Sequence, residues 1–159
     1  MLSIIGIDPG LSTGVGEILD GERKGLIFQG EPKQALIKLN ERLQLHADMG
    51  FEVIIACESF RQSGRAHVTS QPEATETAVR VSAIAEARGV RFLSQPPGDA
   101  KRVAPNWLLQ AVGLWVLPHN IQQKDANDVN DGLRHAVLAM SRVRATMFDA
   151  LLARAARKL

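Results

Sequence analysis

The chain begins with a continuous apolar run, LSIIGID over residues 2–8, that ends on an aspartate. An apolar run of this length without polar alternation is typical of a strand that is buried on both faces. An ionised carboxylate at the end of such a strand loses hydration unless a partner or a cation compensates it. The PGLSTG stretch after Asp8 consists of turn-forming and small residues. We therefore expect a central strand whose carboxyl end presents Asp8, either as a turn residue or as part of a charged site.

The first half of the chain repeats this pattern once. Two further strands are expected around the Asp-Gly pair at 20–21, followed by a helix that begins at Pro32 and ends at Gly50. A second apolar run, FEVIIACESF over residues 51–60, then predicts another central strand. It also carries a carboxylate, Glu58, at its end.

The second half alternates helices with one more strand. In order, we expect a polar loop at 61–71, a helix at 72–88, a strand at 90–95, mostly helix at 100–116 with a break around Pro105, a loop at 117–128, a helix from about Asn127 to Val143 and another helix to the end. This order predicts an α/β fold, a five-stranded mixed sheet with helices on both faces. No repeat or linker divides residues 1–159, which we interpret as a single domain.

Composition excludes several classes of protein. Aromatic residues make up 4% of the chain and tyrosine is absent, which disfavours a broad base-stacking platform. The single cysteine, Cys57, excludes an intramolecular disulfide and a cysteine-rich zinc site, and suits a reducing cytoplasm. No apolar run approaches the roughly 20 residues that span a bilayer, and no signal-peptide pattern is present. We therefore expect a cytoplasmic protein without a membrane partner.

The two tryptophans, Trp107 and Trp115, are eight residues apart on an apolar helical pattern, which assigns both to the core.

Charge is unevenly distributed, although the net charge is only +2. The last 18 or so residues carry one acid, Asp149, against five basic side chains: Arg142, Arg144, Arg154, Arg157 and Lys158. A basic end of this kind fits a polyanion such as nucleic acid, and it fits a solvated helix equally well.

Four acidic residues are expected to meet at one edge of the sheet. The strands that end in Asp8 and Glu58 should be parallel neighbours, which lie about 5 Å apart. Their carboxyl edge is where open α/β sheets bind ligands. Asp128 and Asp131 are three residues apart and share one face of the late helix, with His135 one turn further along.

Such a cluster has a specific chemistry. Carboxylates brought together raise one another's pKa unless a cation neutralises them. Oxygen ligands favour Mg²⁺ or Mn²⁺ over zinc, and two such ions promote phosphodiester hydrolysis. Taken singly, Asp8 fits a turn and the helix acids fit a helix N-terminus. Their joint occurrence favours a nuclease centre with two divalent ions.

Three motifs carry a family resemblance. IIGIDPGLSTG, VIIACESF and NDVNDGLRHAV resemble, in this order, the acidic motifs of the RuvC family of Holliday-junction resolvases in the RNase H-like superfamily. The match runs from Ser3 to about Met140, and GIDPGLSTG is its most specific part. The resemblance implies an RNase H-like fold and a homodimer that cuts opposing strands of a four-way DNA junction with Mg²⁺ or Mn²⁺. It implies four metal ligands: Asp8, Glu58, Asp128 and Asp131. Because some members carry a histidine in the last cluster, His135 is a second candidate ligand, although a partly buried polar neighbour is the favoured interpretation.

The resemblance also implies contacts with DNA. Lys101 takes the place of a basic residue near the scissile phosphate, and Phe60 that of an aromatic residue that helps to open the junction. A solvated lysine and a core phenylalanine are the alternatives. Arg61 and Arg65 are candidate phosphate contacts. The family's glycine-rich GxGxAxK stretch is replaced by RVAPNWLLQ, so its second lysine lacks a counterpart, although Arg102 is near.

Other functions remain to be separated from this one. The altered loops also suit a broader structure-specific nuclease that cuts flaps, forks or other branched DNA. A binding module with an inactive centre is disfavoured because all four acids are present. An actin-like phosphotransferase needs a second nucleotide-clasping half for which 159 residues leave no room, so we expect no nucleotide cofactor. The small size and the departures from the bacterial pattern suit a bacterial cell in which the gene is carried by a phage or mobile element.

Overall fold

The computed structural model describes residues 1–59, 72–96 and 98–158, which form a five-stranded sheet flanked by helices. The strand order is β3-β2-β1-β4-β5. Their bounds are β1 Leu2–Asp8, β2 Thr13–Leu19, β3 Arg23–Gly30, β4 Glu52–Glu58 and β5 Arg91–Gln95. Strands β1, β4 and β5 are parallel, whereas β1-β2 and β2-β3 pair antiparallel. The predicted mixed sheet is confirmed.

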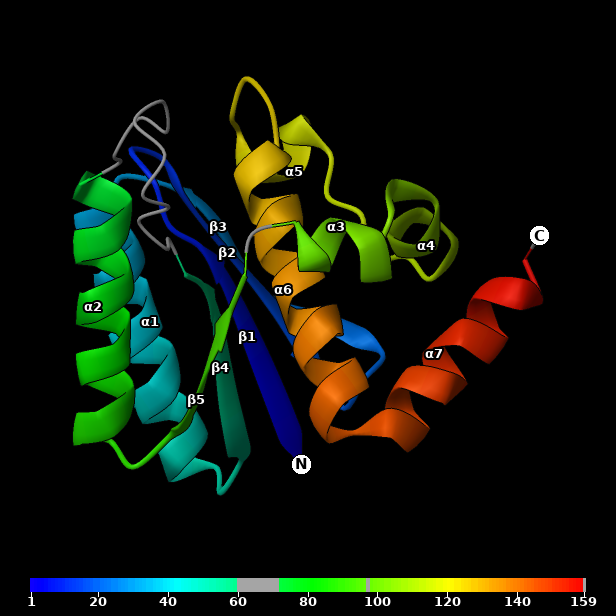
Figure 1. The fold of residues 1–159 in the computed structure, drawn as a ribbon, viewed down its shortest axis with the longest axis horizontal. Helices are drawn as coiled ribbons and strands as arrows, with labels where there is room; N and C mark the ends of the chain where they lie inside the picture. Colours follow the sequence, from blue (N-terminus) through cyan, green and yellow to red (C-terminus); the bar gives the residue numbers. More distant parts are fainter. Residues whose placement is uncertain (60–71, 97, 159) are drawn as a thin grey trace.

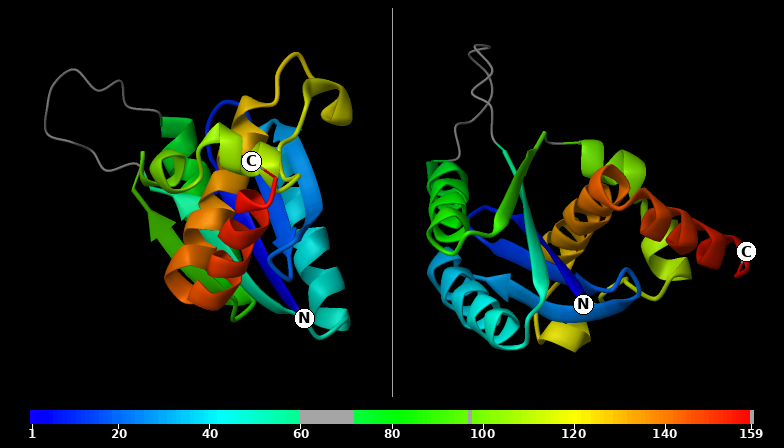
Figure 2. Two further views of the ribbon diagram at one scale, coloured as in Figure 1. Left: turned by 90° about the vertical axis from the view of Figure 1, so that its right-hand side faces the viewer. Right: turned by 90° about the horizontal axis from the view of Figure 1, so that it is seen from below.

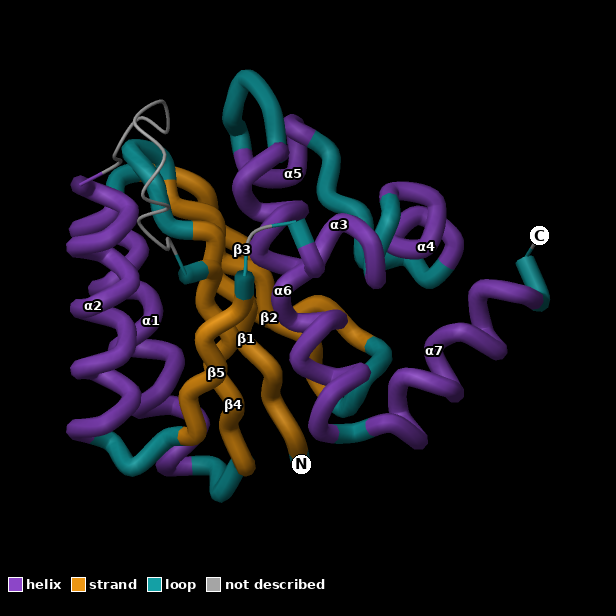
Figure 3. Tube along the Cα trace, viewed as in Figure 1, coloured by secondary structure: helices purple, strands orange, loops and turns teal. Residues whose placement is uncertain are grey.

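Helices cover both faces of this sheet (Figures 1 and 2). The bounds are α1 Pro32–Asp48, α2 Pro72–Ala87, α3 Asp99–Val103, α4 Asn106–Ala111, α5 Pro118–Ile121, α6 Asn127–Val143 and α7 Ala145–Ala156. Helices α1 and α2 lie on one face, and α6 lies across the other, with the short helices α3 to α5 beside it (Figure 3). Among the described helices, none is long and apolar enough to traverse a bilayer.

Alternation along β1 divides the interior into two layers. Ile4 belongs to the apolar cluster beneath α6, whereas Ile5 and Ile7 belong to the cluster beneath α1 and α2. Because successive side chains of a strand point to opposite faces, the same alternation turns Asp8 toward α6. Asp8, the last residue of β1, therefore faces the helix that carries Asp128 and Asp131.

Glycines allow α6 to approach the sheet closely. A Cβ atom on Gly6 would lie 1.9 Å from the carbonyl oxygen of Gly132, and one on Gly14 would lie 1.9 Å from that of Asp128. Any other residue would therefore push the helix away. The two glycines therefore allow the first half of α6 to lie directly against β1 and the start of β2.

The region between β5 and α6 differs from the prediction. The break expected around Pro105 does separate α3 from α4, but α4 ends at Ala111 and not at Val116, and Gly113, with a φ of +76°, follows it. Residues 114–117 belong to no helix or strand. The Asn130 side chain binds this segment, because it accepts from the N–H of Val116 and donates to the Val116 carbonyl oxygen, at 2.9 Å each. Helix α5 falls within the expected loop.

The assignment of Trp107 to the core was wrong. Its neighbours Leu108 and Leu109 are buried and fix the packed face of α4, which leaves Trp107 49% exposed. Trp115 is partly buried and packs against the cluster beneath α6, as expected.

Candidate active site

The structure brings the four predicted acids to one edge of the sheet. Ile7 of β1 pairs with Cys57 of β4, so the next residues, Asp8 and Glu58, end neighbouring parallel strands side by side. Helix α6 begins at the same edge (Figure 1). Its first two turns carry Asp128 and Asp131.

The pKa of Asp8 reflects its burial and the nearness of the other three acids. The pKa of Asp8 is raised to about 8, first by burial and then by Glu58, Asp131 and Asp128, in that order. Lys101 acts in the opposite direction. All four acids are thus close enough to interact electrostatically, and at neutral pH the metal-free cluster retains a proton on Asp8.

Asp128 shows a weaker form of the same effect. Burial raises its pKa, and the charges of Asp125 and Asp131 raise it further. A hydrogen bond from the Ser12 side chain opposes the change. Ser12 belongs to the turn after β1, so the small-residue stretch contributes a polar group to this edge.

Glu58 is held by a buried histidine. His135 Nε2 lies 2.9 Å from Glu58 Oε2, and His135 Nδ1 lies 2.7 Å from Gln95 Oε1. His135 is only 1% exposed. With both ring nitrogens engaged, this histidine has no free lone pair for a metal, which supports the interpretation as a polar neighbour of the acids.

Asp131 is held by two cations. Lys101 Nζ lies 3.1 Å from its Oδ2, and Arg134, three residues further along α6, bonds its Oδ1. The Lys101 side chain is 68% exposed and that of Arg134 8%. Sequence reasoning placed Lys101 at this site and missed Arg134, although the spacing of three residues after an acid on one helix was a usable signal.

Three further residues, Ala104, Asn106 and Trp115, contact the Arg134 guanidinium. Its Nε donates to the carbonyl oxygen of Ala104 at 3.2 Å, and its Nη2 bonds the side chain of Asn106. The guanidinium lies over the Trp115 ring, 5.7 Å from the centroid. Residues between β5 and α6 thus fix the arginine that bonds Asp131.

Arg102, another predicted site residue, does not take part in these contacts. Arg102 is exposed and pairs with Asp99 at 2.5 Å. Phe60, Arg61 and Arg65 lie outside the described residues, so their roles stay predictions.

The chemistry of the donor set fits a hard divalent cation. Carboxylate oxygens are the ligands that Mg²⁺ and Mn²⁺ prefer. A cation would offset both the burial and the neighbouring negative charges that raise the pKa of Asp8. As folded, however, no three His, Cys, Asp or Glu side chains among the described residues are grouped closely enough to hold one ion. The acids are neighbours, and Lys101 and Arg134 supply the positive charge beside Asp131.

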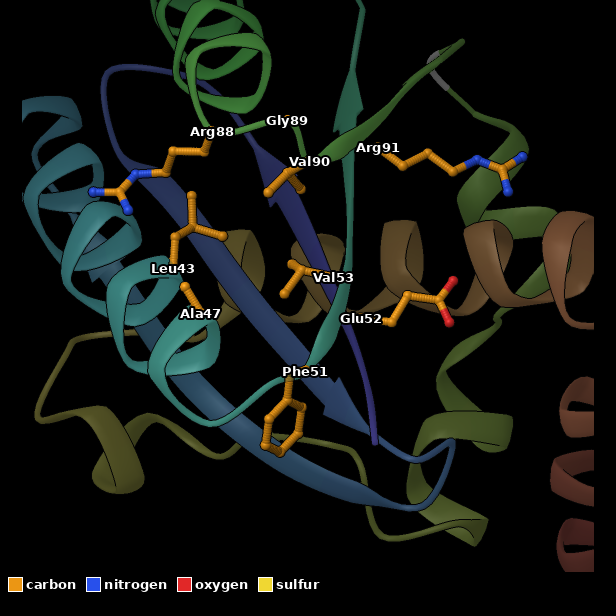
Figure 4. Close-up of a pocket in the computed structure, with 9 residues that line it drawn as sticks. All are labelled: Leu43, Ala47, Phe51, Glu52, Val53, Arg88, Gly89, Val90 and Arg91. Carbon is orange, nitrogen blue, oxygen red and sulfur yellow. The ribbon is translucent and has the colours of Figure 1, made fainter.

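A cavity lies at the opposite edge of the sheet and is unrelated to this cluster. It has a volume of about 510 Å³ and is lined by Phe51, Val53, Arg88 and Arg91, among others. These residues surround the starts of β4 and β5 (Figure 4). None of the four acids lines it.

Solved structures with the same architecture exist. RuvC from T. thermophilus in complex with a Holliday junction substrate superimposes with a TM-score of 0.58 at 17% sequence identity, covering 91% of this chain and 97% of that chain. The chain has the fold of RuvC. A second RuvC structure from Thermus thermophilus gives a TM-score of 0.51 at 19% identity, covering 96% of this chain and 95% of that chain. No protein-family model matches the chain, and no curated protein does. The predicted RNase H-like α/β fold is confirmed.

Proposed function

We propose that this chain is a divalent-metal-dependent endonuclease that resolves four-way DNA junctions. The observation that carries the proposal is the meeting of four carboxyl groups at the carboxyl edge of a RuvC fold, expressed in the raised pKa of Asp8. The comparison supports branched DNA as substrate, because the T. thermophilus RuvC structure holds a Holliday junction.

The metal would be held by the four acids. Asp8, Glu58, Asp128 and Asp131 are the proposed ligands of Mg²⁺ or Mn²⁺, with two ions in each site. When bound, such ions activate water and stabilise the leaving oxygen of a phosphodiester. The proton that Asp8 retains in the metal-free cluster is released when the carboxylate becomes a ligand.

The basic side chains have separate tasks. Lys101 is exposed beside Asp131 and can turn from that carboxylate to the backbone phosphate of a bound strand. Arg134 is buried and stays with Asp131, so it keeps this acid in place. A homodimer would supply the second site that cutting two opposed strands requires, and sedimentation of the protein with and without a junction tests this assembly.

Cleavage of a synthetic four-way junction tests the proposal. With Mg²⁺ or Mn²⁺ we expect paired nicks in opposed strands. Asp8→Asn should abolish nicking and leave junction binding intact, because it removes a ligand without changing the basic surface. Asp48→Asn is the matched control: it makes the same change at the exposed end of α1 and should cut normally. Failure of the wild-type protein to nick the junction in either metal would contradict the proposal.

Substrate range needs a separate experiment. Where the RuvC family carries a glycine-rich stretch, this chain has α4 with an exposed tryptophan, Trp107. That difference favours a broader preference as the second candidate. Cleavage rates on flaps, forks and four-way junctions of matched sequence distinguish the two: a junction-specific enzyme cuts the four-way substrate much faster than the others.

A further inference from the structure

A chain of hydrogen bonds runs from the acidic cluster into the interior of the protein. It begins at Glu58, passes through His135 and ends at Gln95. The Glu58 side chain is 17% exposed, whereas His135 and Gln95 are 1% and 0% exposed. The outer member faces the site and the inner two are enclosed.

Rigid elements hold both ends of this chain. Glu58 and Gln95 are paired residues at the carboxyl ends of β4 and β5. The N–H of Ser59 donates to the carbonyl oxygen of Gln95 at 2.8 Å, which ties the two strand ends together. His135 enters between them from α6, the helix that the glycine contacts hold against the sheet. The two hydrogen bonds therefore fix the orientation of the His135 ring.

The proton arrangement follows from the partners. If the Gln95 amide presents its oxygen to Nδ1, that nitrogen carries a proton, and Nε2 must carry one too when it faces an ionised carboxylate. If the amide is turned by 180°, its NH₂ donates to Nδ1, and the proton of the neutral ring is on Nε2. In both arrangements, a carboxylate at position 58 accepts its hydrogen bond from His135 Nε2–H.

We propose that His135 is a positioning residue that holds Glu58 in the orientation needed to bind the divalent ion, with Gln95 as its buried support. The inference rests on the proposed function and adds a residue to it. His135 acts through Glu58 and does not itself touch the metal. Hydrogen bonds from outer residues fix the orientation of metal-ligating carboxylates, and losing one typically weakens metal binding by about 10- to 100-fold.

The hydrogen bond is tested first, without metal. In protein labelled with ¹⁵N-histidine, we expect a proton on Nε2 of His135 that exchanges slowly and resonates downfield, assigned by its loss in His135→Gln. Glu58→Ala should move this resonance upfield. The proposal would be overturned if Nε2 carried no proton at a pH where Glu58 is ionised. It would also be overturned if the chemical shift of the Nε2 proton were the same in Glu58→Ala as in the wild type.

Mn²⁺ affinity, measured from the free-ion EPR signal, tests the consequence. We expect His135→Leu to weaken binding by about 10- to 100-fold. His135→Gln keeps a donor for Glu58 and should restore most of the affinity. His119→Leu, which removes an exposed histidine, is the matched control and should bind as the wild type does. Thermal melting verifies folding, and Gln95→Leu, which keeps the histidine and removes its support, should also weaken binding.

The outcomes separate this proposal from its rivals. Pulsed EPR of bound Mn²⁺ should show no coupling to a coordinated imidazole nitrogen; such a coupling, lost in His135→Leu, would make His135 a ligand and overturn the positioning role. Unchanged affinity in both His135→Leu and Gln95→Leu would overturn it as well. Absence of Mn²⁺ binding by the wild type would instead contradict the proposed function, and the proton on Nε2 would then decide the Glu58 contact alone.

Discussion

Two carboxyl groups on neighbouring strands of this protein, the buried Glu17 and the half-buried Asp8, have opposite surroundings. Glu17 of β2 is fully buried on the α1 side, where burial alone would raise its pKa. Four partners outweigh burial and lower that pKa, and Ser3 contributes most, followed by Leu26, His46 and Arg42. Asp8 of β1 has no bonded donor among the described residues. Burial, and then the three other acids around it, raise its pKa to about 8.

The hydrogen bonds around Glu17 explain why its pKa is lowered although the carboxylate is buried. The Ser3 hydroxyl and the Leu26 N–H donate to its two oxygens at 2.6 Å each, and Arg42 Nε donates at 2.8 Å. His46 bonds the same carboxylate. A buried charge with a full set of donors belongs to the fold, whereas a buried acid among like charges indicates a site that a cation completes. Asp8 is of the second kind.

Removing each charge should therefore change stability in opposite directions. Glu17→Gln leaves Arg42 and His46 without their anionic partner and should lower the free energy of unfolding by about 3 kcal/mol. Asp8→Asn replaces a carboxyl group that must take up a proton when the chain folds at pH 7, and should raise it by about 1 kcal/mol in the metal-free protein. Urea unfolding in EDTA at pH 7 measures both. Two losses of similar size would break the comparison, because Asp8 would then be as well satisfied as Glu17.

The pH dependence of unfolding should divide in the same way. The lowered pKa of Glu17 adds stability above the unfolded value near pH 4.5, and this is lost as pH falls below it. The raised pKa of Asp8 means that the unfolded chain releases this proton first, so stability falls as pH rises from about 4 to about 8. Glu17→Gln should reduce the loss of unfolding free energy at acid pH, and Asp8→Asn should reduce the fall between about pH 4 and pH 8. If Asp8→Asn left that fall unchanged, the strong coupling of Asp8 to its neighbours would be refuted.

Lys101 should give the smallest effect. Because its charge lowers the pKa of Asp8, Lys101→Met should raise that pKa further and slow junction cleavage at neutral pH. The free energy of unfolding should change by less than about 1 kcal/mol, since the lysine is mostly exposed. Single-turnover cleavage and urea unfolding measure the two effects. Arg80→Met, which removes an exposed ion pair on α2, is the matched control; equal cleavage by both variants would remove Lys101 from the site.

The sequence predicted the part of this site that follows from regular structure. Parallel neighbouring strands with acids at their ends place Asp8 beside Glu58, and a spacing of three puts Asp128 and Asp131 on one helix face. The segments that depend on individual tertiary contacts were not predicted. Residues 114–117, which belong to no helix or strand, are bound at Val116 by Asn130, which lies in another element.

The partners of Glu17 and the contact of Gln95 with His135 were also missed, and for a physical reason. The partners of Glu17 come from positions 3, 26, 42 and 46, and Gln95 meets His135 across 40 residues. Such contacts depend on how closely α6 and α1 approach the sheet, which single residues such as Gly6 decide. No periodic pattern in the sequence records that distance.

A carboxyl titration of Asp8 by ¹³C NMR, with Asp8→Asn for assignment, tests the central claim most directly. In EDTA the account predicts a pKa near 8, and with saturating Mg²⁺ a fall below the ordinary aspartate value, because the ion replaces the proton. An ordinary pKa in the metal-free protein that Mg²⁺ leaves unchanged would contradict it.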